Sequence, residues 1–238
     1  MKYMGSKNRH AKEILEIVLK NRKDGQYYVE PFVGGFNIID KVSGKRIGND
    51  IHHYLIELFR AVQGGWQPPD FISYEQYQDI RKHSSKYSDA LVGFVGFGCS
   101  YSGKWWGGYA RGNDANGTPR NYCAESKRNI LSQHNGLQGI EICNTSYSDL
   151  IIPENSIIYC DPPYAGATMY KDKFDHNAFW KWCEEMSLAG HDVFVSEYRA
   201  PSGWTSVWQK EVHNTLVQDT GSKSGVENLF VFNKNRVL

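Results

Sequence analysis

Apolar residues recur at helical spacing early in the chain and in short continuous runs farther along it. Between residues 11 and 20, Ile14, Leu15, Val18 and Leu19 fall on one helical face. Helices are also predicted over 38–42, 51–63, 71–83, 124–134 and 178–188. Strands are predicted over 27–29, 46–50, 140–143, 157–160 and 192–197, and a closing antiparallel pair over 204–214 and 228–233. Strands that alternate with helices predict an α/β fold.

One stretch interrupts this alternation. From about residue 86 to residue 122, Gly, Ser, Asn, Tyr and Trp dominate and regular periodicity is lost. A long irregular segment inside a domain is usually functional or disordered. Aromatic residues argue against disorder here; they are Phe94, Phe97, Tyr101, Trp105, Trp106 and Tyr109. We therefore predict an inserted subdomain over 71–122, between two parts of one domain, 1–70 and 123–238.

Composition indicates the cellular compartment and the kinds of partner more clearly than it indicates the reaction. The net charge of +1 gives no overall sign of a polyanionic partner, so any nucleic-acid surface must be a local patch. The five cysteines are scattered without a CxxC pair, so zinc spacing is absent, and their odd number argues against a complete disulfide framework. The sequence also has no apolar run of membrane-spanning length and no signal-peptide pattern. We expect a cytoplasmic protein without a metal or a membrane partner.

The predicted strand 157–160 runs directly into Asp161-Pro162-Pro163-Tyr164. Prolines lack the N–H that a sheet needs and fix their own φ, so the strand must stop there. Asp161 and Tyr164 then lie on a stiff loop at the carboxyl end of a strand, the edge where open α/β sheets bind ligands. A carboxylate, exposed carbonyls and a flat ring suit a planar amine. The alternative is an ordinary proline-rich turn.

Two other predicted strand ends carry residues suited to a ligand. The Gly34-Gly35 turn allows a positive φ and close approach of the backbone. Asp50 ends the second strand, where an acid accepts hydrogen bonds from ribose hydroxyls, although it can also cap the helix predicted from residue 51. The turn is neither a GxGxxG nor a Walker loop, which favours a nucleoside cofactor without pyrophosphate.

Four motifs together resemble a known family. Lys2-Tyr3-x-Gly5-Ser6-Lys7, Glu30-Pro31-Phe32-Val33-Gly34-Gly35, Asn49-Asp50-Ile51 and Tyr159-Cys160-Asp161-Pro162-Pro163-Tyr164 stand in this order. Their order and spacing are similar to those of Dam-like adenine-specific DNA N6-methyltransferases of the D12, or α, class. The resemblance covers nearly the whole chain. It implies a Rossmann-like methyltransferase sheet, with 1–70 and 123–238 as the S-adenosylmethionine-binding catalytic domain and 71–122 as a DNA-recognition subdomain.

The resemblance also implies S-adenosyl-L-methionine as cofactor and assigns residues to it. The cofactor-binding set is Lys2, Tyr3, Gly5, Lys7, Glu30, Pro31, Phe32, Gly34, Gly35, Asp50 and Asp161. The catalytic loop that receives the flipped adenine is Asp161, Pro162, Pro163 and Tyr164. Phe36 stands where relatives commonly have a small residue, which predicts a narrower pocket. Residues 170–174 are predicted to form a lid over the base.

The chemistry of the target amine agrees with this assignment. The adenine amine is a poor nucleophile because its lone pair is delocalised into the ring. Acceptance of its hydrogens by Asp161 and the Pro162 carbonyl favours a localised lone pair. Tyr164 is expected to stack on a base that has left the duplex. Alignment of the reacting atoms can supply roughly 7–11 kcal/mol, so neither a metal nor a covalent nucleophile is needed.

The predicted insert supplies candidates for contact with double-stranded DNA. Asn116-Gly117 is a strong hairpin-turn signal. The DNA-binding set around it is Lys104, Arg111, Asn113, Arg120, Asn121 and Tyr122. Arg and Asn side chains can bind guanine and adenine edges in pairs of hydrogen bonds, and lysines contact phosphates. The alternative for each of these residues is a solvated loop.

Several readings of the function therefore stand side by side. The preferred one is site-specific methylation of adenine N6 in DNA by a monomer or weak dimer. The recognised sequence is GATC by analogy with the family. The enzyme would belong to a restriction–modification system or act without a partner restriction enzyme. An enzyme acting on RNA or on a protein amide is one alternative. A catalytically inactive module that binds S-adenosylmethionine or DNA is another.

Overall fold

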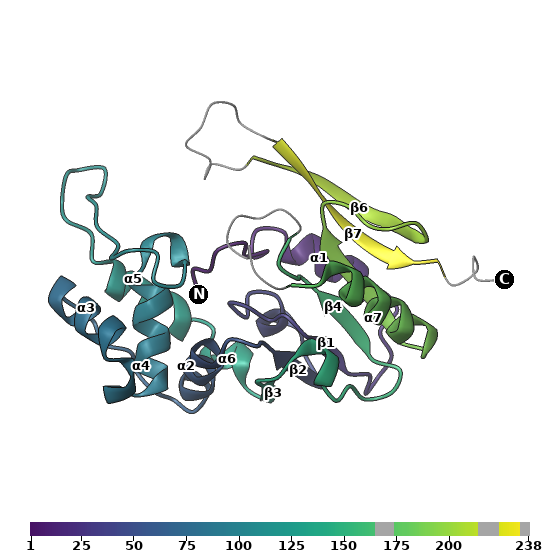
Figure 1. The fold of residues 1–238 in the computed structure, drawn as a ribbon, viewed down its shortest axis with the longest axis horizontal. Coiled ribbons are helices and arrows are strands. Elements are labelled where there is room, and N and C mark those ends of the chain that lie inside the picture. Colours follow the sequence, from purple (N-terminus) through teal and green to yellow (C-terminus); the bar gives the residue numbers. More distant parts are fainter. Residues whose placement is uncertain (165–173, 214–223, 234–238) are drawn as a thin grey trace.

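The chain forms a central sheet with helices on both faces. A computed structural model describes residues 1–164, 174–213 and 224–233. Within these ranges seven strands lie in the order β3-β2-β1-β4-β5-β7-β6 (Figure 1). Their bounds are β1 Tyr28–Glu30, β2 Arg46–Asn49, β3 Ile140–Cys143, β4 Ile157–Cys160, β5 Asp192–Glu197, β6 Trp204–His213 and β7 Ser224–Phe232. No helix of the described ranges is long and apolar enough to cross a membrane.

The connectivity of the sheet confirms the predicted Rossmann-like methyltransferase fold. Strands β1 to β5 pair in parallel, whereas β7 lies between β5 and β6 and is antiparallel to both. The strand order reverses between β1 and β4, where Val29 pairs with Ile158. Open α/β sheets bind their ligands outside the carboxyl ends of the strands at such a reversal. The loops after β1 and β4 therefore define the place to look for a site.

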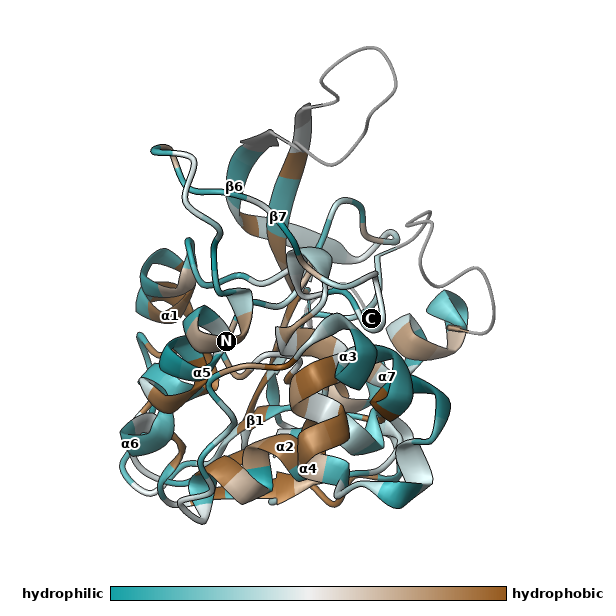
Figure 2. Ribbon diagram, turned by 90° about the vertical axis from the view of Figure 1, so that its left-hand side faces the viewer, coloured by the Kyte–Doolittle hydropathy of each residue, from teal (hydrophilic) through white to brown (hydrophobic). Residues whose placement is uncertain are grey.

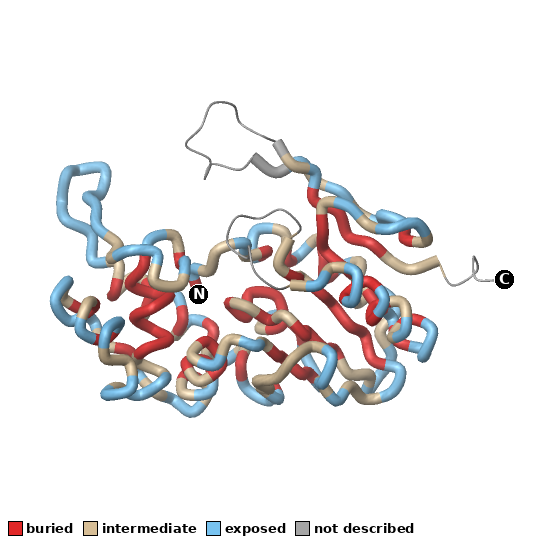
Figure 3. The backbone as a smooth tube through the Cα atoms, viewed as in Figure 1, coloured by how far each residue is buried: buried red, intermediate tan, exposed pale blue. Residues whose placement is uncertain are grey.

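Strand β4 divides its side chains between the two faces of the sheet. Ile157 and Tyr159 belong to one hydrophobic cluster, and Ile158 and Cys160 to the other. The first cluster lies against α1 (Ala11–Val18) and α2 (His53–Gln63), and the second against α7 (His176–Leu188). Figure 3 shows the central strands as largely buried, and α7 buries the face that carries Phe179, Trp180 and Cys183. Burial on both faces explains the unbroken apolar run that predicted this strand.

The remaining helices are short. They are η1 Ile39–Lys41, α3 Tyr74–Lys82, η2 Ser84–Lys86, α4 Asp89–Gly93, η3 Phe94–Gly98, η4 Tyr101–Gly103, α5 Tyr122–Leu131, α6 His134–Leu137 and η5 Tyr147–Asp149. The helix predicted over 38–42 is wrong, because only a 3₁₀ turn forms there. A segment of five residues gains too few hydrogen bonds to offset the cost of starting a helix. The helix predicted from residue 71 begins at Tyr74, after a capping box formed by Ser73 and Gln76.

The predicted loss of regular structure after residue 86 is also wrong over residues 89–98. There α4 continues directly into the π-helix η3, and Val92, Phe94, Val95 and Phe97 are buried in the same cluster as the first face of the sheet. Figure 2 shows apolar residues gathered on α2, α4 and β1. The helices of the insert thus share a core with the sheet domain. The boundaries at 71 and 122 stay a prediction.

The glycines of this helix interrupt the apolar pattern that would have predicted it, and they also let the helix pack closely against its neighbours. A Cβ on Gly93 would lie 2.1 Å from the carbonyl oxygen of Tyr54 in α2. A Cβ on Gly96 would lie 2.1 Å from the ring of Trp105. The glycines of this segment therefore mark a close helix contact rather than a loop.

We expect Gly93→Ala to lower the free energy of unfolding by about 1–3 kcal/mol, because backbone atoms of α2 must move to admit the methyl group. Chemical denaturation measures the difference. Gly64→Ala is the matched control, since its Cβ would meet the nearest atom at an ordinary 3.4 Å. Equal stability of the two variants would contradict the close contact.

Candidate active site

Acidic side chains gather at the carboxyl edge of the sheet. Glu30 ends β1, Asp161 follows β4, Glu197 ends β5, and Glu227 lies on the adjoining β7. Glu30, Glu197 and Glu227 are each at most 5% exposed. The side chain of Asp161 keeps 22% of its surface exposed, so it is the acid of this group that an incoming molecule can reach. Buried carboxylates need hydrogen bonds or opposite charges to be tolerated.

Lys7 supplies the positive charge at this edge. Its Nζ lies 2.9 Å from Asp161 Oδ1 and 3.3 Å from Glu227 Oε1, and it donates to the carbonyl of Gly5 at 3.2 Å. Burial acts to lower the pKa of Lys7, but Asp161 and Glu227 outweigh it, and the pKa is raised. The ammonium therefore stays charged while only 7% exposed.

Tyr164 closes this cluster from the loop after β4. Its hydroxyl donates to Glu227 Oε1 at 3.1 Å. The Lys7 ammonium lies 4.5 Å from the centre of its ring, and the ring of Tyr198 meets it edge-on at 4.8 Å. One face of the ring predicted to stack on a base thus carries the lysine ammonium.

The environment of Asp161 raises its pKa. Burial is the largest cause; the charge and hydrogen bond of Lys7 oppose it, and the charge of Glu227 adds to it. The pKa of Glu30 is raised still further by burial, although the hydroxyl of Tyr28 donates to its Oε1 at 2.8 Å. These acids are held by the fold in surroundings that favour binding of a cation or of an N–H donor.

Asp50 is oriented by backbone N–H groups at the neighbouring strand end. Its carboxylate accepts from Gly34 N at 3.1 Å and from His52 N at 2.9 Å, and Gly34 adopts a φ of +47°. Burial raises the pKa of Asp50, and these hydrogen bonds oppose the rise. The alternative that Asp50 caps the next helix is wrong. His52 is the N-cap of α2, and its Nδ1 accepts from Leu55 N at 3.3 Å.

Two asparagines that were not predicted as site residues hold these loops in place. Asn49, fully buried at the end of β2, donates to the carbonyls of Pro31 and Thr145, each at 3.0 Å. Asn144 donates to the carbonyl of Asp50 at 2.7 Å. An amide within a buried strand must find partners, and Asn49 near the end of the strand predicted over 46–50 was the available signal.

The other residues predicted to bind the cofactor are not all gathered at this edge. Tyr3 packs on the glycine turn, since a Cβ on Gly34 or Gly35 would lie within 2.9 Å of its side chain. Phe32 packs against Tyr147 and Phe179 on the side of α7. Lys2 is exposed on the surface of the insert, 5.6 Å from the ring centre of Tyr122.

Phe36, predicted to narrow the pocket, directs its bulk into the core. The residue is fully buried, and its ring centre lies 4.2 Å from that of Phe59 in α2. Its φ of +55° is unusual for a side chain of this size. Of the predicted lid over 170–174, residues 170–173 lie outside the described ranges, and Phe174 packs against Phe32 and Phe179.

The predicted hairpin turn is confirmed at residues 114–118. Gly117 adopts a φ of +82°, and its N–H donates to the Asp114 carbonyl at 3.1 Å. The Asp114 carboxylate also accepts from Asn116 N and Thr118 N, each at 2.9 Å. The turn projects from the insert as an exposed loop beside α5 (Figure 1).

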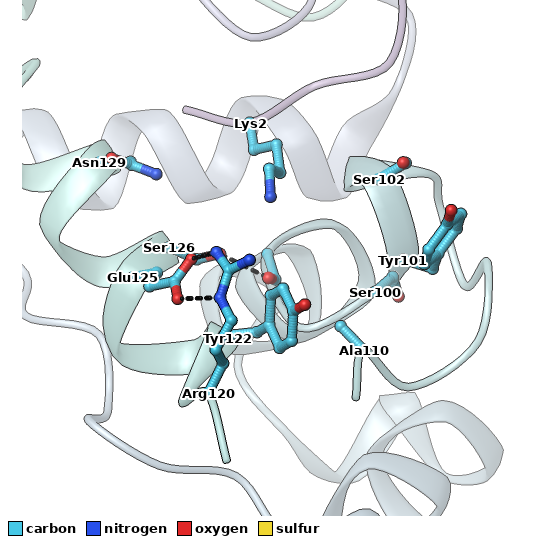
Figure 4. Close-up of a pocket in the computed structure, with 11 residues that line it drawn as sticks. Lys2, Ser100, Tyr101, Ser102, Ala110, Arg120, Tyr122, Glu125, Ser126 and Asn129 are labelled. Carbon is cyan, nitrogen blue, oxygen red and sulfur yellow. Dashed lines mark hydrogen bonds and ion pairs between the residues drawn. The ribbon is translucent and has the colours of Figure 1, made fainter. Parts of the chain in front are cut away.

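Two residues predicted to contact DNA have other partners. The guanidinium of Arg120 donates to both carboxylate oxygens of Glu125, at 2.8 and 2.6 Å. The Asn121 side chain caps α5 by accepting from Ala124 N at 3.0 Å, and donates to the Asp70 carbonyl. Arg120, Tyr122 and Lys2 line a cavity of about 120 Å³ between α5 and the start of the chain, away from Asp161 (Figure 4).

The other predicted contacts remain on the surface. Arg111 lies over the ring of Tyr74 at 4.4 Å, and Lys104, Arg111 and Asn113 are exposed. In the part of the chain that the structure describes, no three His, Cys, Asp or Glu side chains group as metal ligands.

A family model matches one segment of the chain. Residues 3–90 match the family model of D12 class N6 adenine-specific DNA methyltransferases. The resemblance inferred from the motifs is confirmed over this segment, which holds Lys7, Glu30 and Asp50. The loop at Asp161, predicted to be catalytic, lies beyond it.

One solved structure is also similar to this chain. It is the crystal structure of SMU.472, a candidate methyltransferase, complexed with SAH. The identity is 12% and the TM-score 0.36, over 94% of this chain and 52% of that one. The chain therefore spans about half the length of that protein.

His52 makes the start of α2, next to Asp50, sensitive to acid. Burial lowers its pKa to about 4 from 6.5, so the neutral ring is favoured in the folded protein. As pH falls from about 6.5 to about 4, the unfolded chain takes up this proton first, and the folded state loses stability. We expect His52→Asn, which keeps a capping side chain, to lose less stability over this window.

Thermal melting between pH 7 and pH 4 measures this effect. His53→Asn is the control, because the exposed His53 ring pairs with Asp89, which raises its pKa. An identical loss of stability in wild type and His52→Asn would contradict the assignment.

Proposed function

We propose that this protein transfers a methyl group from S-adenosyl-L-methionine to the N6 amine of an adenine flipped out of double-stranded DNA. The observation that carries the proposal is the position of Asp161. This partly exposed carboxylate follows β4 at the reversal of the sheet, beside Lys7 and Glu30, which lie in the segment matching the D12 family model.

The residues at the ends of β1 and β2 fit the chemistry of the cofactor. Each oxygen of the Asp50 carboxylate accepts one backbone N–H and keeps a lone pair for a ribose hydroxyl. Glu30 has a raised pKa that an incoming ammonium group would lower. Lys7 supplies a cation suited to the carboxylate of the cofactor's methionine part. When bound, S-adenosylmethionine supplies an electrophilic methyl group.

Asp161 and the backbone of its loop act on the substrate amine. Asp161 and the Pro162 carbonyl accept the two hydrogens of the amine and favour a lone pair localised on nitrogen. The new bond between nitrogen and the methyl carbon would replace the bond of that carbon to the cofactor sulfur, which would keep the electron pair, and the nitrogen would release one proton toward this acceptor side. The raised pKa of Asp161 suits a group that receives hydrogen bonds from a weak donor. No charged side chain needs to form a covalent bond to the base.

Tyr164 provides the flat surface for the flipped base. Flipping costs a few kcal/mol, and stacking on an aromatic ring returns roughly 1–3 kcal/mol per base. The hydroxyl of Tyr164 is tied to Glu227, which limits rotation of the ring. A ring held in one orientation loses less freedom when a base stacks on it.

We infer that the hairpin side of the insert faces DNA. Lys104, Arg111 and Asn113 are exposed there and can meet phosphates or base edges, and the Arg111 guanidinium lies over the ring of Tyr74. Arg120 and Asn121 support the hairpin and α5 through Glu125 and Asp70, so their part in DNA binding is to hold the surface. GATC as the recognised sequence stays a prediction from family resemblance.

The alternative of an inactive binding module has one observation in its favour. The ammonium of Lys7 lies on Asp161 Oδ1, where a substrate amine would donate. A protein in which Lys7 never leaves this position would bind the cofactor or DNA without methyl transfer.

We expect labelled S-adenosylmethionine to pass its methyl group to N6 of adenine in unmethylated duplex DNA, and Asp161→Ala to lower the rate at least about 100-fold by removing the acceptor. Scintillation counting and nucleoside analysis measure the product, and sequencing of the methylated DNA identifies the site. RNA of the same sequence is the control substrate.

Binding of S-adenosylmethionine without transfer, measured by calorimetry, supports the inactive module. Neither binding nor transfer would contradict both readings. Transfer to RNA alone would support the RNA enzyme.

We expect Lys104→Ala to weaken DNA binding equally for all sequences and to reduce the slope of log K against log salt by about 1, the value for one lost phosphate contact. Fluorescence anisotropy at several salt concentrations measures the slope. Lys181→Ala, at an exposed lysine of α7, is the control. An unchanged slope in Lys104→Ala would remove this residue from the DNA surface.

A further inference from the structure

Glu227 is a buried acid of the sheet edge that was not predicted as a site residue, and it contacts both Lys7 and Tyr164. We propose that Glu227 is a positioning residue that retains the Lys7 ammonium when the substrate amine takes the place of Lys7 on Asp161, and that holds Tyr164 in orientation. This inference rests on the proposed methyl transfer to a flipped adenine.

The distances show one ammonium shared between two acids. Lys7 Nζ lies 2.9 Å from Asp161 and 3.3 Å from Glu227, and both side chains are largely buried. An N–H donor that binds Asp161 must compete with this ammonium. A buried ammonium that loses its partner is strongly destabilised. With Glu227 already in contact, Lys7 can give up Asp161 without becoming an unpaired charge.

The sheet holds Glu227 where this exchange requires it. Strand β7 lies between β5 and β6, and the next residue, Asn228, pairs with Glu197 in β5. The Asn228 side chain donates to the Tyr198 carbonyl at 3.2 Å. Glu227 is therefore anchored by strands on both sides, whereas Asp161 belongs to a loop. The fixed acid keeps the lysine, and the accessible acid is released for the substrate.

The same carboxylate fixes the surface on which the base is proposed to stack. The Tyr164 hydroxyl donates to Glu227 Oε1 at 3.1 Å, and the ring of Tyr198 packs edge-on against the Tyr164 ring. A Gln at position 227 can still accept this hydrogen bond, but it cannot balance the ammonium. The two roles of Glu227 can thus be separated by substitution.

The charge of Glu227 also affects the pKa of Asp161. Three groups shift the pKa of Asp161: Lys7 from the segment before α1, Glu227 from β7 and Tyr164 from its own loop. Glu30 of β1 and Tyr159 of β4 also interact with its charge. Glu227 raises the pKa of Asp161 and Lys7 lowers it. Without the charge of Glu227, Lys7 acts on Asp161 alone, and the pKa of Asp161 falls.

We expect Glu227→Gln to lower kcat by roughly 100-fold, because the acceptor stays occupied by Lys7. The KM for DNA should change little, and the acidic limb of the kcat–pH profile should move to lower pH. Glu227→Asp, which keeps the charge, should recover part of the rate and the position of the limb. Glu211→Gln, an exposed acid on β6, is the matched control. Thermal melting confirms that each variant is folded.

Three outcomes would overturn this role. Glu227→Gln with wild-type kcat excludes it, and so does a loss of kcat with an unmoved acidic limb, which marks a purely structural residue. If Glu227→Gln fails to fold, Glu227→Asp decides the question. A wild-type rate and a wild-type acidic limb of the kcat–pH profile in Glu227→Asp support the role of the charge. An acidic limb that moves although the charge is retained overturns it. Wild-type protein without any methyl transfer overturns the proposed function itself, which distinguishes that failure from a failure of Glu227 alone.

Discussion

The balance of charge at the carboxyl edge of the sheet governs the rest of the site. Parallel strands end together, so Glu30, Asp161 and Glu197 are brought to one edge, and the reversed strand β7 adds Glu227. Removing carboxylates from water is costly unless an opposite charge compensates. Lys7 provides that charge to two acids at once. This leaves the edge acidic overall, which suits an amine or a cationic cofactor.

The origin of Lys7 ties distant parts of the chain to this balance. It lies in the segment just before α1, yet its partners follow β4 and lie on β7. The same segment carries Tyr3, whose ring packs on the glycine turn after β1 and lies 5.5 Å from Phe97 of the insert. One short segment therefore contacts the glycine turn after β1, the loop after β4 and the insert.

The insert combines a structural and a surface role. Its helix α4 with η3 is buried against α2, where Gly93 lets the two backbones approach. Its hairpin is exposed, but Arg120 and Asn121 are committed to Glu125 and to the cap of α5. A surface held in this way is rigid at its base, which favours precise placement of the few side chains that we propose to meet DNA.

The sequence by itself determined the strands, the position of the loop after β4 and the family resemblance over residues 3–90. Apolar runs bounded by turns define β4 and β5, and two prolines must end β4 at Asp161 whatever surrounds it. It did not reveal α4, because glycines that allow close helix packing look like loop residues when the partner helix is unknown. It also did not reveal Glu227, Asn49 or the sharing of Lys7. Those depend on which strands become neighbours, and only the tertiary structure, by placing β7 beside β5, decided that a lysine near the start of the chain meets an acid near its end.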